Sequence, residues 1–195
     1  MSENFALMLP DEPVPVRLMN TIWADRAGVH DALRTADELR AWLRAIGEDA
    51  DGDASIDRRD VETFRSLRDA LRRLAALLTE DSRQAAASPT EDVEQAVADV
   101  NQAVTRATTW PQLSMQDGRL RRWSTGTESV VARSLSAIAE EAVDLFTGPD
   151  QERLRACYAP GCVLYFVKDH PRREWCSTAC GNRVRAARHY RRHRS

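Results

Sequence analysis

Apolar residues recur at helical spacing along much of the segment 30–147. The clearest run lies within residues 61–78, where apolar side chains fall three or four positions apart over about five turns. This stripe consists of Val61, Phe64, Leu67, Leu71, Leu74 and Leu78. The pattern predicts a long amphipathic helix that buries one face in a core.

A shorter helix is predicted before it. Thr35 and Glu38 have the spacing of a capping box, and Gly47 stands where a left-handed residue would close the helix. The apolar face of this helix consists of Leu39, Trp42, Leu43 and Ile46. Residues 48–57, which follow, are acidic and small and are typical of a solvated loop.

A third helix is predicted from residue 88. We expect Ser88 to cap it, Pro89 to take its first position and Glu91 to complete a second capping box. Its apolar face is made of small and β-branched residues, Val93, Ala96, Val97, Val100 and Val104. Such a face suits close packing against a neighbouring element.

A hairpin and one more helix follow. Asp117-Gly118 separates two short runs that contain apolar residues, which is the pattern of a two-residue β-hairpin. The apolar residues of these runs are Leu113, Met115, Leu120 and Trp123. Residues 128–146 form the last predicted helix of this part of the chain, and Gly148-Pro149 stops it.

These elements predict a mainly α protein, with a helical bundle and a small β-hairpin over residues 1–148 and a separate module over residues 149–195. Residues 1–148 contain no glycine-rich phosphate loop, nucleophile elbow or HExxH pair, so we expect no enzymatic activity. Trp42, Trp110 and Trp123 could line a pocket for a small-molecule ligand, although tryptophans at such spacing are more often part of a core.

Charge divides the chain in two. The formal net charge is −2, from 28 Lys+Arg and 30 Asp+Glu. Residues 151–195 hold 11 basic and 3 acidic residues, or +8, which leaves 17 basic and 27 acidic residues, or −10, for residues 1–150. A basic segment attracts polyanions and an acidic body repels them, so we expect any nucleic-acid contact in the tail.

The sequence also indicates a compartment. No signal-peptide pattern and no uninterrupted apolar run of about 18 residues occurs, so we expect a cytoplasmic protein without membrane contact. In that reducing compartment, the four cysteines are better candidates for metal ligands than for disulfides.

The four cysteines lie close together in the basic tail. Cys157, Cys162, Cys176 and Cys180 form a C-x4-C pair and a C-x3-C pair with thirteen residues between them. Two close pairs joined by a short spacer are what one tetrahedral Zn²⁺ with four thiolate ligands requires. We therefore expect one structural zinc ion. The alternatives are an unmetallated buried cluster, a redox pair, or His170 in place of one cysteine.

Local patterns around the cysteines predict a treble-clef-like or ribbon-like zinc finger. Ala159-Pro160-Gly161 suits a tight turn that directs Cys157 and Cys162 inward as a metal knuckle. The β-branched and aromatic run 163–167 is expected to form a hairpin with the segment just before Cys176. A helix is predicted over about residues 177–192, which would anchor its start to the metal through Cys180.

The tetrapeptide Cys-Gly-Asn-Arg at 180–183, preceded by WCSTA and followed by VRAARHYRRHR, resembles the CGNR zinc finger of bacteria. That finger usually follows a helical domain called ABATE, for which a role as a stress-induced transcription regulator has been inferred. Leu18-Met19-Asn20-Thr21 resembles the Leu-Val-Asn-Thr stretch of that domain, and residues 35–43 resemble its next helix. The resemblance implies zinc binding by the four cysteines and a role in transcription.

The end of the chain is a basic segment without a single acid. Its arginines, the candidate nucleic-acid contacts, are Arg183, Arg185, Arg188, Arg191, Arg192 and Arg194. On a helix, Arg185, Arg188 and Arg192 share one stripe, while Val184, Ala186, Ala187 and Tyr190 offer an apolar side. Asn182 and Arg183 follow the last cysteine, and for both we favour hydrogen bonding to the metal site over base reading.

These features predict a zinc-containing, DNA-binding transcriptional regulator whose helical domain responds to a stress, a ligand or a partner. One finger gives modest, salt-sensitive affinity, so specific binding would need a homodimer or a partner protein. The alternative is a protein-interaction module whose finger docks on an acidic surface, of a partner or of a neighbouring subunit. RNA binding is a third hypothesis.

Overall fold

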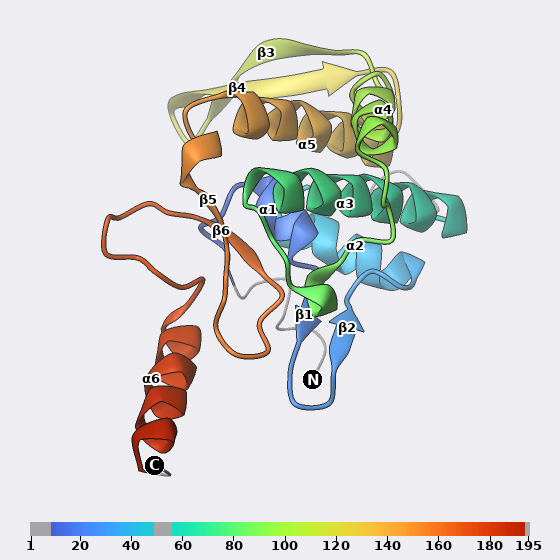
Figure 1. Cartoon of the computed structure of the whole chain (residues 1–195). Helices are drawn as coiled ribbons and strands as arrows, with labels where there is room; N and C mark the ends of the chain where they lie inside the picture. The colour runs from blue at the N-terminus through green and yellow to red at the C-terminus, as the bar shows by residue number, and fades with distance from the viewer. Residues whose placement is uncertain (1–8, 49–55, 194–195) are drawn as a thin grey trace.

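The computed structural model describes residues 9–48 and 56–193, and a long helix, α3 (Arg58–Leu78), lies at its centre (Figure 1). Asp57 caps this helix by accepting hydrogen bonds from the backbone N–H groups of Arg59 and Asp60. The residues of its stripe that are fully buried are Val61, Phe64, Leu67 and Leu71. The predicted long helix is confirmed.

Helix α2 (Ala36–Ala45) is also confirmed. Thr35 and Glu38 form the expected capping box, and Gly47 follows the helix with a φ of +92°. The indole of Trp42 packs edge-on against Phe64 of α3, at 6.1 Å between ring centroids, so α2 is fixed to the central helix.

Helix α4 (Val93–Val104) begins later than we predicted. Asp92 caps it by accepting a hydrogen bond from the Gln95 N–H. The predicted cap at Ser88 is wrong, because the Ser88 hydroxyl donates to the carbonyl of Asp69 on α3 at 2.7 Å. The Ser88 hydroxyl thus makes a tertiary contact instead of capping a helix, and the helix starts further along the chain, at Val93. The buried residues of α4 are Ala96, Val100 and Ala103, whereas Val97 is 44% exposed.

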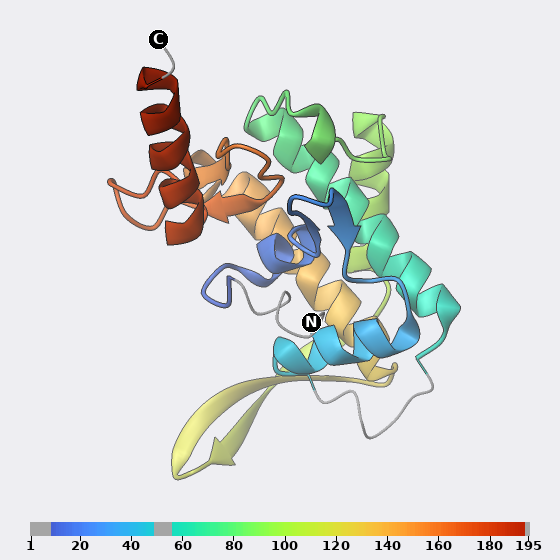
Figure 2. The ribbon, with the colours of Figure 1, turned by 90° about the horizontal axis from the view of Figure 1, so that it is seen from below.

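The predicted hairpin is confirmed as β3 (Thr109–Gln116) and β4 (Arg119–Gly126). Its two turn residues, Asp117 and Gly118, both have positive φ, as a type I′ turn requires. The hairpin forms a two-stranded ribbon that projects away from the helices (Figure 2).

Helix α5 (Val130–Thr147) returns the chain to the core, begins at the cap Ser129 and ends at Gly148. The Gly148 N–H donates to the Asp144 carbonyl at 2.8 Å, and a Cβ on Gly148 would lie 2.6 Å from that oxygen. The glycine is therefore required by this close approach, and the predicted stop is confirmed.

The N-terminal segment forms α1 (Val14–Met19) and a small hairpin, β1 (Ile22–Ala24) and β2 (Val29–Asp31). Two buried arginines of α3 hold this segment in place. Arg68 donates to the Asp31 carboxylate at 2.7 Å, and Arg72 donates to the Met19 carbonyl at 2.9 Å. Both side chains are 2% exposed.

The tail consists of β5 (Leu154–Ala156), β6 (Tyr165–Val167) and α6 (Thr178–Arg192), with short 3-10 turns at Gln151–Arg153 and, earlier in the chain, Gln84–Ala86. The predicted pairing of 163–167 with the segment before Cys176 is wrong, because β6 pairs antiparallel with β5. The first cysteine pair therefore lies in the connection between the two strands.

The core of the helical part continues into the tail. Leu154, Ala156, Tyr165 and Val167, from β5 and β6, belong to the same buried cluster as the apolar faces of α3 and α5. The mainly α fold with small antiparallel hairpins is confirmed. Within the described residues, every helix is too short or too polar to cross a membrane.

Candidate metal centre and basic helix

The connection between β5 and β6 forms a knuckle that holds Cys157 and Cys162. The Cys157 N–H donates to the Leu164 carbonyl at 3.0 Å, and the Cys162 N–H donates to the Ala159 carbonyl at 2.9 Å. Gly161 has a φ of +71°, a left-handed conformation that glycine adopts without strain. These backbone bonds fold the turn so that both cysteines are buried.

The second cysteine pair lies at the start of α6. Cys176 precedes Ser177, the cap of the helix, and Cys180 lies in the first helical turn. The Cys180 N–H donates to the Ser177 hydroxyl at 3.3 Å. The positive end of the helix dipole thus lies beside the sulfurs, where it favours thiolates.

The four sulfurs are placed for one metal ion. All four Sγ atoms lie within 4.8 Å of one another. The Sγ–Sγ distance is 3.8 Å between Cys162 and Cys176 and 3.4 Å between Cys176 and Cys180. A tetrahedron with Zn–S bonds of about 2.3 Å has edges of about 3.8 Å. The donor set fits Zn²⁺, and Cys157, Cys162, Cys176 and Cys180 would hold it.

Four thiols this close cannot all ionise unaided. Hydrogen bonding to the Cys157, Cys162 and Cys180 sulfurs raises the pKa of Cys176 far above its usual range. Bonds from the other three cysteines, together with the Arg183 guanidinium, lower the pKa of Cys180. A divalent cation removes this conflict because it stabilises every thiolate at once, and four thiolates leave it no open position.

Arg183 contacts the metal ligands directly. One of its nitrogens donates to the Cys180 sulfur at 2.9 Å, and this bond raises the pKa of Arg183. Asn182 is exposed, and its Oδ1 accepts a hydrogen bond from Arg185. In this structure, Arg183 makes the thiolate contact, whereas Asn182 orients an arginine of the basic helix.

Gly181, the glycine of the CGNR tetrapeptide, allows a close contact with Trp175. It is buried, and a Cβ at this position would lie 3.3 Å from the Trp175 ring. The absence of a side chain lets the indole lie against the first turn of α6. Together with the Cys180 ligand, this contact fixes the direction in which the helix leaves the metal centre.

Beyond its second turn, α6 leaves the body of the protein (Figures 1 and 2). Val184 is 8% exposed and packs with the cysteines, whereas Tyr190 is 62% exposed. The expected apolar side is therefore buried only in its first part. The exposed arginines of α6 are Arg183, Arg185, Arg188, Arg191 and Arg192, while Arg194 lies outside the described residues.

Comparison with protein families decides the identity of both parts. The model of ABATE, described as "Putative stress-induced transcription regulator", matches residues 12–149, more than half of the chain. The chain belongs to the ABATE family. The model of the CGNR zinc finger matches residues 153–193, so the resemblance of both parts is confirmed. No curated protein matches the chain.

The ABATE domain supports the CGNR finger through Arg83. This arginine donates from one nitrogen to the carbonyls of Cys157 at 2.8 Å and Cys162 at 3.0 Å. Two further bonds of 2.6 and 2.7 Å hold its guanidinium against the Asp81 carboxylate. Although burial raises it, hydrogen bonds from Arg83 and from the Tyr165 hydroxyl keep the pKa of Asp81 below its usual value. A buried ion pair of the ABATE domain therefore fixes the knuckle.

The signature stretch of the ABATE domain contacts the finger as well. Asn20 accepts from the Tyr165 N–H and donates to the Tyr165 carbonyl, both at 2.9 Å, as a neighbouring strand would. Arg72, which binds the Met19 carbonyl, also donates to the Val163 carbonyl at 3.3 Å. Asn20, which lies in the stretch that resembles the Leu-Val-Asn-Thr of the ABATE domain, thus joins the two parts of the protein.

A third contact fixes the segment before Cys176. Glu12 accepts a hydrogen bond from the Val167 N–H at 2.8 Å and pairs with Arg173. Arg173 in turn donates to the Cys176 carbonyl at 3.0 Å, and its guanidinium lies 4.9 Å from the centre of the Phe166 ring. Both halves of the metal centre are therefore tied to the ABATE domain.

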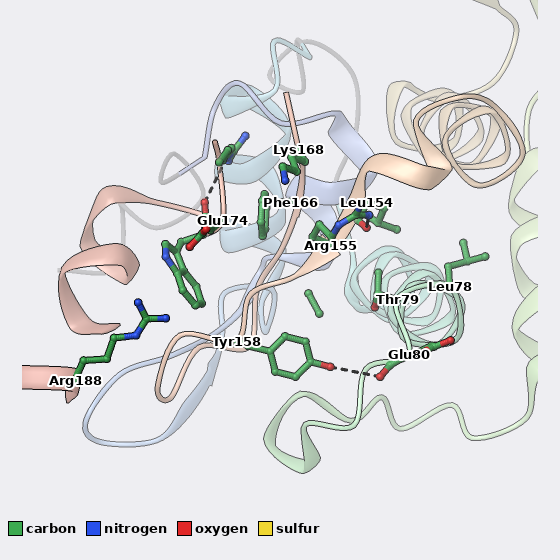
Figure 3. Close-up of a pocket in the computed structure, with 13 residues that line it drawn as sticks. Leu78, Thr79, Glu80, Leu154, Arg155, Tyr158, Phe166, Lys168, Glu174 and Arg188 are labelled. Atoms are coloured by element: carbon green, nitrogen blue, oxygen red, sulfur yellow. Dashed lines mark hydrogen bonds between the residues drawn. The ribbon is translucent and has the colours of Figure 1, made fainter. Parts of the chain in front are cut away.

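A cavity of about 560 Å³ lies between the end of α3 and the finger (Figure 3). Arg155, Lys168 and Arg188 line it together with Tyr158 and Trp175. The Tyr158 hydroxyl donates to the Glu80 carbonyl at 3.4 Å. The cavity is basic and aromatic, and its lining includes one arginine of α6.

Trp42 lies in the core, as tryptophans at helical spacing more often do. Trp42 is 1% exposed in the core, and its indole nitrogen is buried without a hydrogen-bond partner. Trp110 is 45% exposed at the base of the ribbon. The side chain of Trp123 lies outside the described residues.

Proposed function

We propose that this ABATE protein is a bacterial transcriptional regulator that binds DNA through the basic helix of its zinc finger. The observation that carries the proposal is α6 itself. Its start is fixed by a metal ligand, its described part carries five exposed arginines without an acid, and it projects from an otherwise acidic body. A single α-helix of this kind fits the major groove of DNA.

The arginines of α6 suit both parts of a DNA contact. A guanidinium binds phosphate oxygens and guanine edges with two parallel hydrogen bonds. Asn182 holds Arg185, and the Cys180 thiolate holds Arg183, so these two side chains are oriented before any ligand arrives. Arg188 also lines the basic cavity, and Lys168 and Arg155 extend the positive surface from α6 toward the ABATE domain.

The rest of the proposal follows from the metal centre. Four cysteines that bind a metal and form no disulfide are typical of a reducing compartment, which supports a cytoplasmic protein. Because the tetrahedron leaves no position for a substrate, we propose a structural zinc ion and no enzymatic activity. Control by stress or by a ligand stays a prediction. The cavity beside Glu80 is the place where a ligand would contact both α3 and α6.

The test compares two charge-matched variants of the full-length, zinc-loaded protein. Fluorescence anisotropy with random duplex DNA is recorded over a series of salt concentrations for Arg188→Ala plus Arg192→Ala. The control is Arg58→Ala plus Arg106→Ala, which removes two exposed arginines of the ABATE domain away from the finger. Loss of two phosphate contacts should reduce the slope of log affinity against log salt by about 2.

The wild type and the control variant should bind with the same steep salt dependence. Equal affinity of the α6 variant and the wild type would move the contact surface elsewhere. Absence of DNA binding at low salt in every protein would favour the alternative, in which the finger docks on an acidic protein surface.

A further inference from the structure

The ribbon formed by β3 and β4 is amphipathic. Residues that face each other across an antiparallel pair lie on the same face, as do residues two apart on one strand. Met115 pairs with Leu120, and Leu113 lies two positions before Met115, so these three side chains share one face. Gln112 and Ser114 lie on the other face, which is polar toward the tip. The sequence alternates as it does in a strand with one buried face.

This apolar face is uncovered. Leu113 is 76% exposed, Met115 is 68% exposed and Leu120 is 67% exposed. A two-stranded ribbon without a packed face is only marginally stable in water, and the outer edges of β3 and β4 are unpaired within the described residues. A face with the pattern of burial but without a cover indicates an interaction surface.

The same chain carries a second uncovered apolar surface. A groove of about 270 Å³ lies between α3, α4 and α5, lined by Leu77, Val97 and Val143 above Phe146. Leu77 is 52% exposed, Val97 is 44% exposed and Val143 is 38% exposed. Val97 belongs to the small, β-branched stripe of α4, so this helix also has an apolar position that the monomer leaves in water.

The two surfaces carry opposite charges. Arg122, the cross-strand partner of Leu113, lies on the apolar face of the ribbon. Glu94 lies one turn before Val97 on α4, and Glu140 lies one turn before Val143 on α5, both exposed to solvent. The ribbon and the rim of the groove are therefore complementary in charge, and both surfaces are apolar at their centre.

We propose that a second copy of this chain covers both surfaces, each copy placing its ribbon in the groove of the other. Each strand of the ribbon has eight residues and spans about 26 Å. Helix α5 has 18 residues and is about 27 Å long, so the ribbon is long enough to run along a partner helix. A reciprocal exchange closes as a two-fold dimer and leaves no ribbon exposed.

The dimer stands independently of DNA binding, because neither surface includes a residue of α6. It would nevertheless supply the second finger that specific recognition by so small a module requires.

Sedimentation equilibrium on the full-length, zinc-loaded protein tests the proposal. The wild type should be a dimer at protein concentrations well below about 100 µM. Leu113→Ser plus Leu120→Ser should raise the dimer dissociation constant at least about a hundredfold, because both symmetric contacts lose their apolar centre. The matched control, Gln112→Ala plus Ser114→Ala on the polar face of the same ribbon, should leave the constant unchanged.

A charge exchange identifies the groove as the partner surface. Arg122→Glu, and separately Glu140→Arg, should each weaken the dimer at least tenfold, and the two changes together should restore it. A monomeric wild type at about 100 µM overturns the proposal. So does a dimer that depends on the ribbon but not on the groove residues. Ribbon variants that keep the dimer and lose DNA binding would assign the ribbon to DNA instead.

Discussion

Arg83 should govern the zinc affinity of a finger that begins about 70 residues further along the chain. It lies in the connection after α3, and its side chain is 12% exposed. Besides the Cys157 and Cys162 carbonyls, it donates to the Leu164 carbonyl at 3.3 Å. Replacement by methionine keeps the length of the side chain and removes the guanidinium. Three knuckle carbonyls and the Asp81 carboxylate, which is 2% exposed, then lose a donor.

The magnitude follows from the buried ion pair. Removing one partner of such a pair costs about 3–5 kcal/mol, because the remaining charge stays buried and uncompensated. Part of this lost free energy should appear as weaker zinc binding, since a residue that orients metal ligands contributes about 10–100-fold to metal affinity. We therefore expect Arg83→Met to weaken zinc binding by about 1.4–2.7 kcal/mol. Arg83→Lys keeps the charge but loses the planar guanidinium, so its zinc affinity should lie between those of Arg83→Met and the wild type.

Competition with a chromophoric zinc chelator measures the affinity, and thermal unfolding of the loaded protein measures stability. The matched control is Arg58→Met, which removes an arginine that is 92% exposed and paired with Glu62 at 2.7 Å. A surface pair of this kind contributes at most about 1 kcal/mol, so zinc affinity should not change. Equal zinc affinity of Arg83→Met and the wild type would refute the view that the ABATE domain supports the metal centre.

Two further predictions concern the metal and the core. Cys157→Ser should release zinc and remove hydrogen-exchange protection from α6. Helices α3 and α5 should keep their protection, because they belong, with β5 and β6, to a core that does not contain the metal ligands. Unchanged zinc content would contradict the ligand assignment. Burial raises the pKa of Glu141, against the opposing effects of the Val14 N–H and Arg17. A raised folded-state pKa stabilises the protein below the unfolded value of about 4.3, and this contribution is lost as the pH rises. Glu141→Gln keeps the acceptor for Val14, so in urea unfolding it should be more stable than the wild type at pH 7 and equal to it near pH 4. Equal stability at both pH values would show that the charge of Glu141 is not disfavoured by folding.

Features that depend on neighbours in the sequence were predictable from it. The capping box at Thr35, the two-residue turn at Asp117-Gly118 and the stop at Gly148 use contacts within a few residues. The four cysteines were predictable as one metal site because zinc demands a fixed number and type of ligand. The helix predicted over residues 177–192 matches α6, since Gly181 is the one helix breaker in this segment and a single glycine does not end a helix.

Other features depend on contacts that no local pattern records. Ser88 has the local character of a helix cap, but its hydroxyl binds α3, so the helix starts at Val93. The residue types of the run 163–167 are typical of a strand, but a short strand does not specify its partner. The sequence therefore did not predict that β5 is this partner. Arg68 and Arg72 on the apolar side of α3 were a signal of buried polar contacts, because a charge on a core face needs a partner.

The sequence by itself determined which residues bind the metal and which segment is basic, because ligand chemistry and charge belong to the residues themselves. The tertiary structure alone decided what holds the metal centre in place. Arg83 is 74 residues from Cys157, and Asn20 is 145 residues from Tyr165. Such bonds depend on the closed core around α3, since the packing of distant segments buries these polar groups and thereby selects their partners.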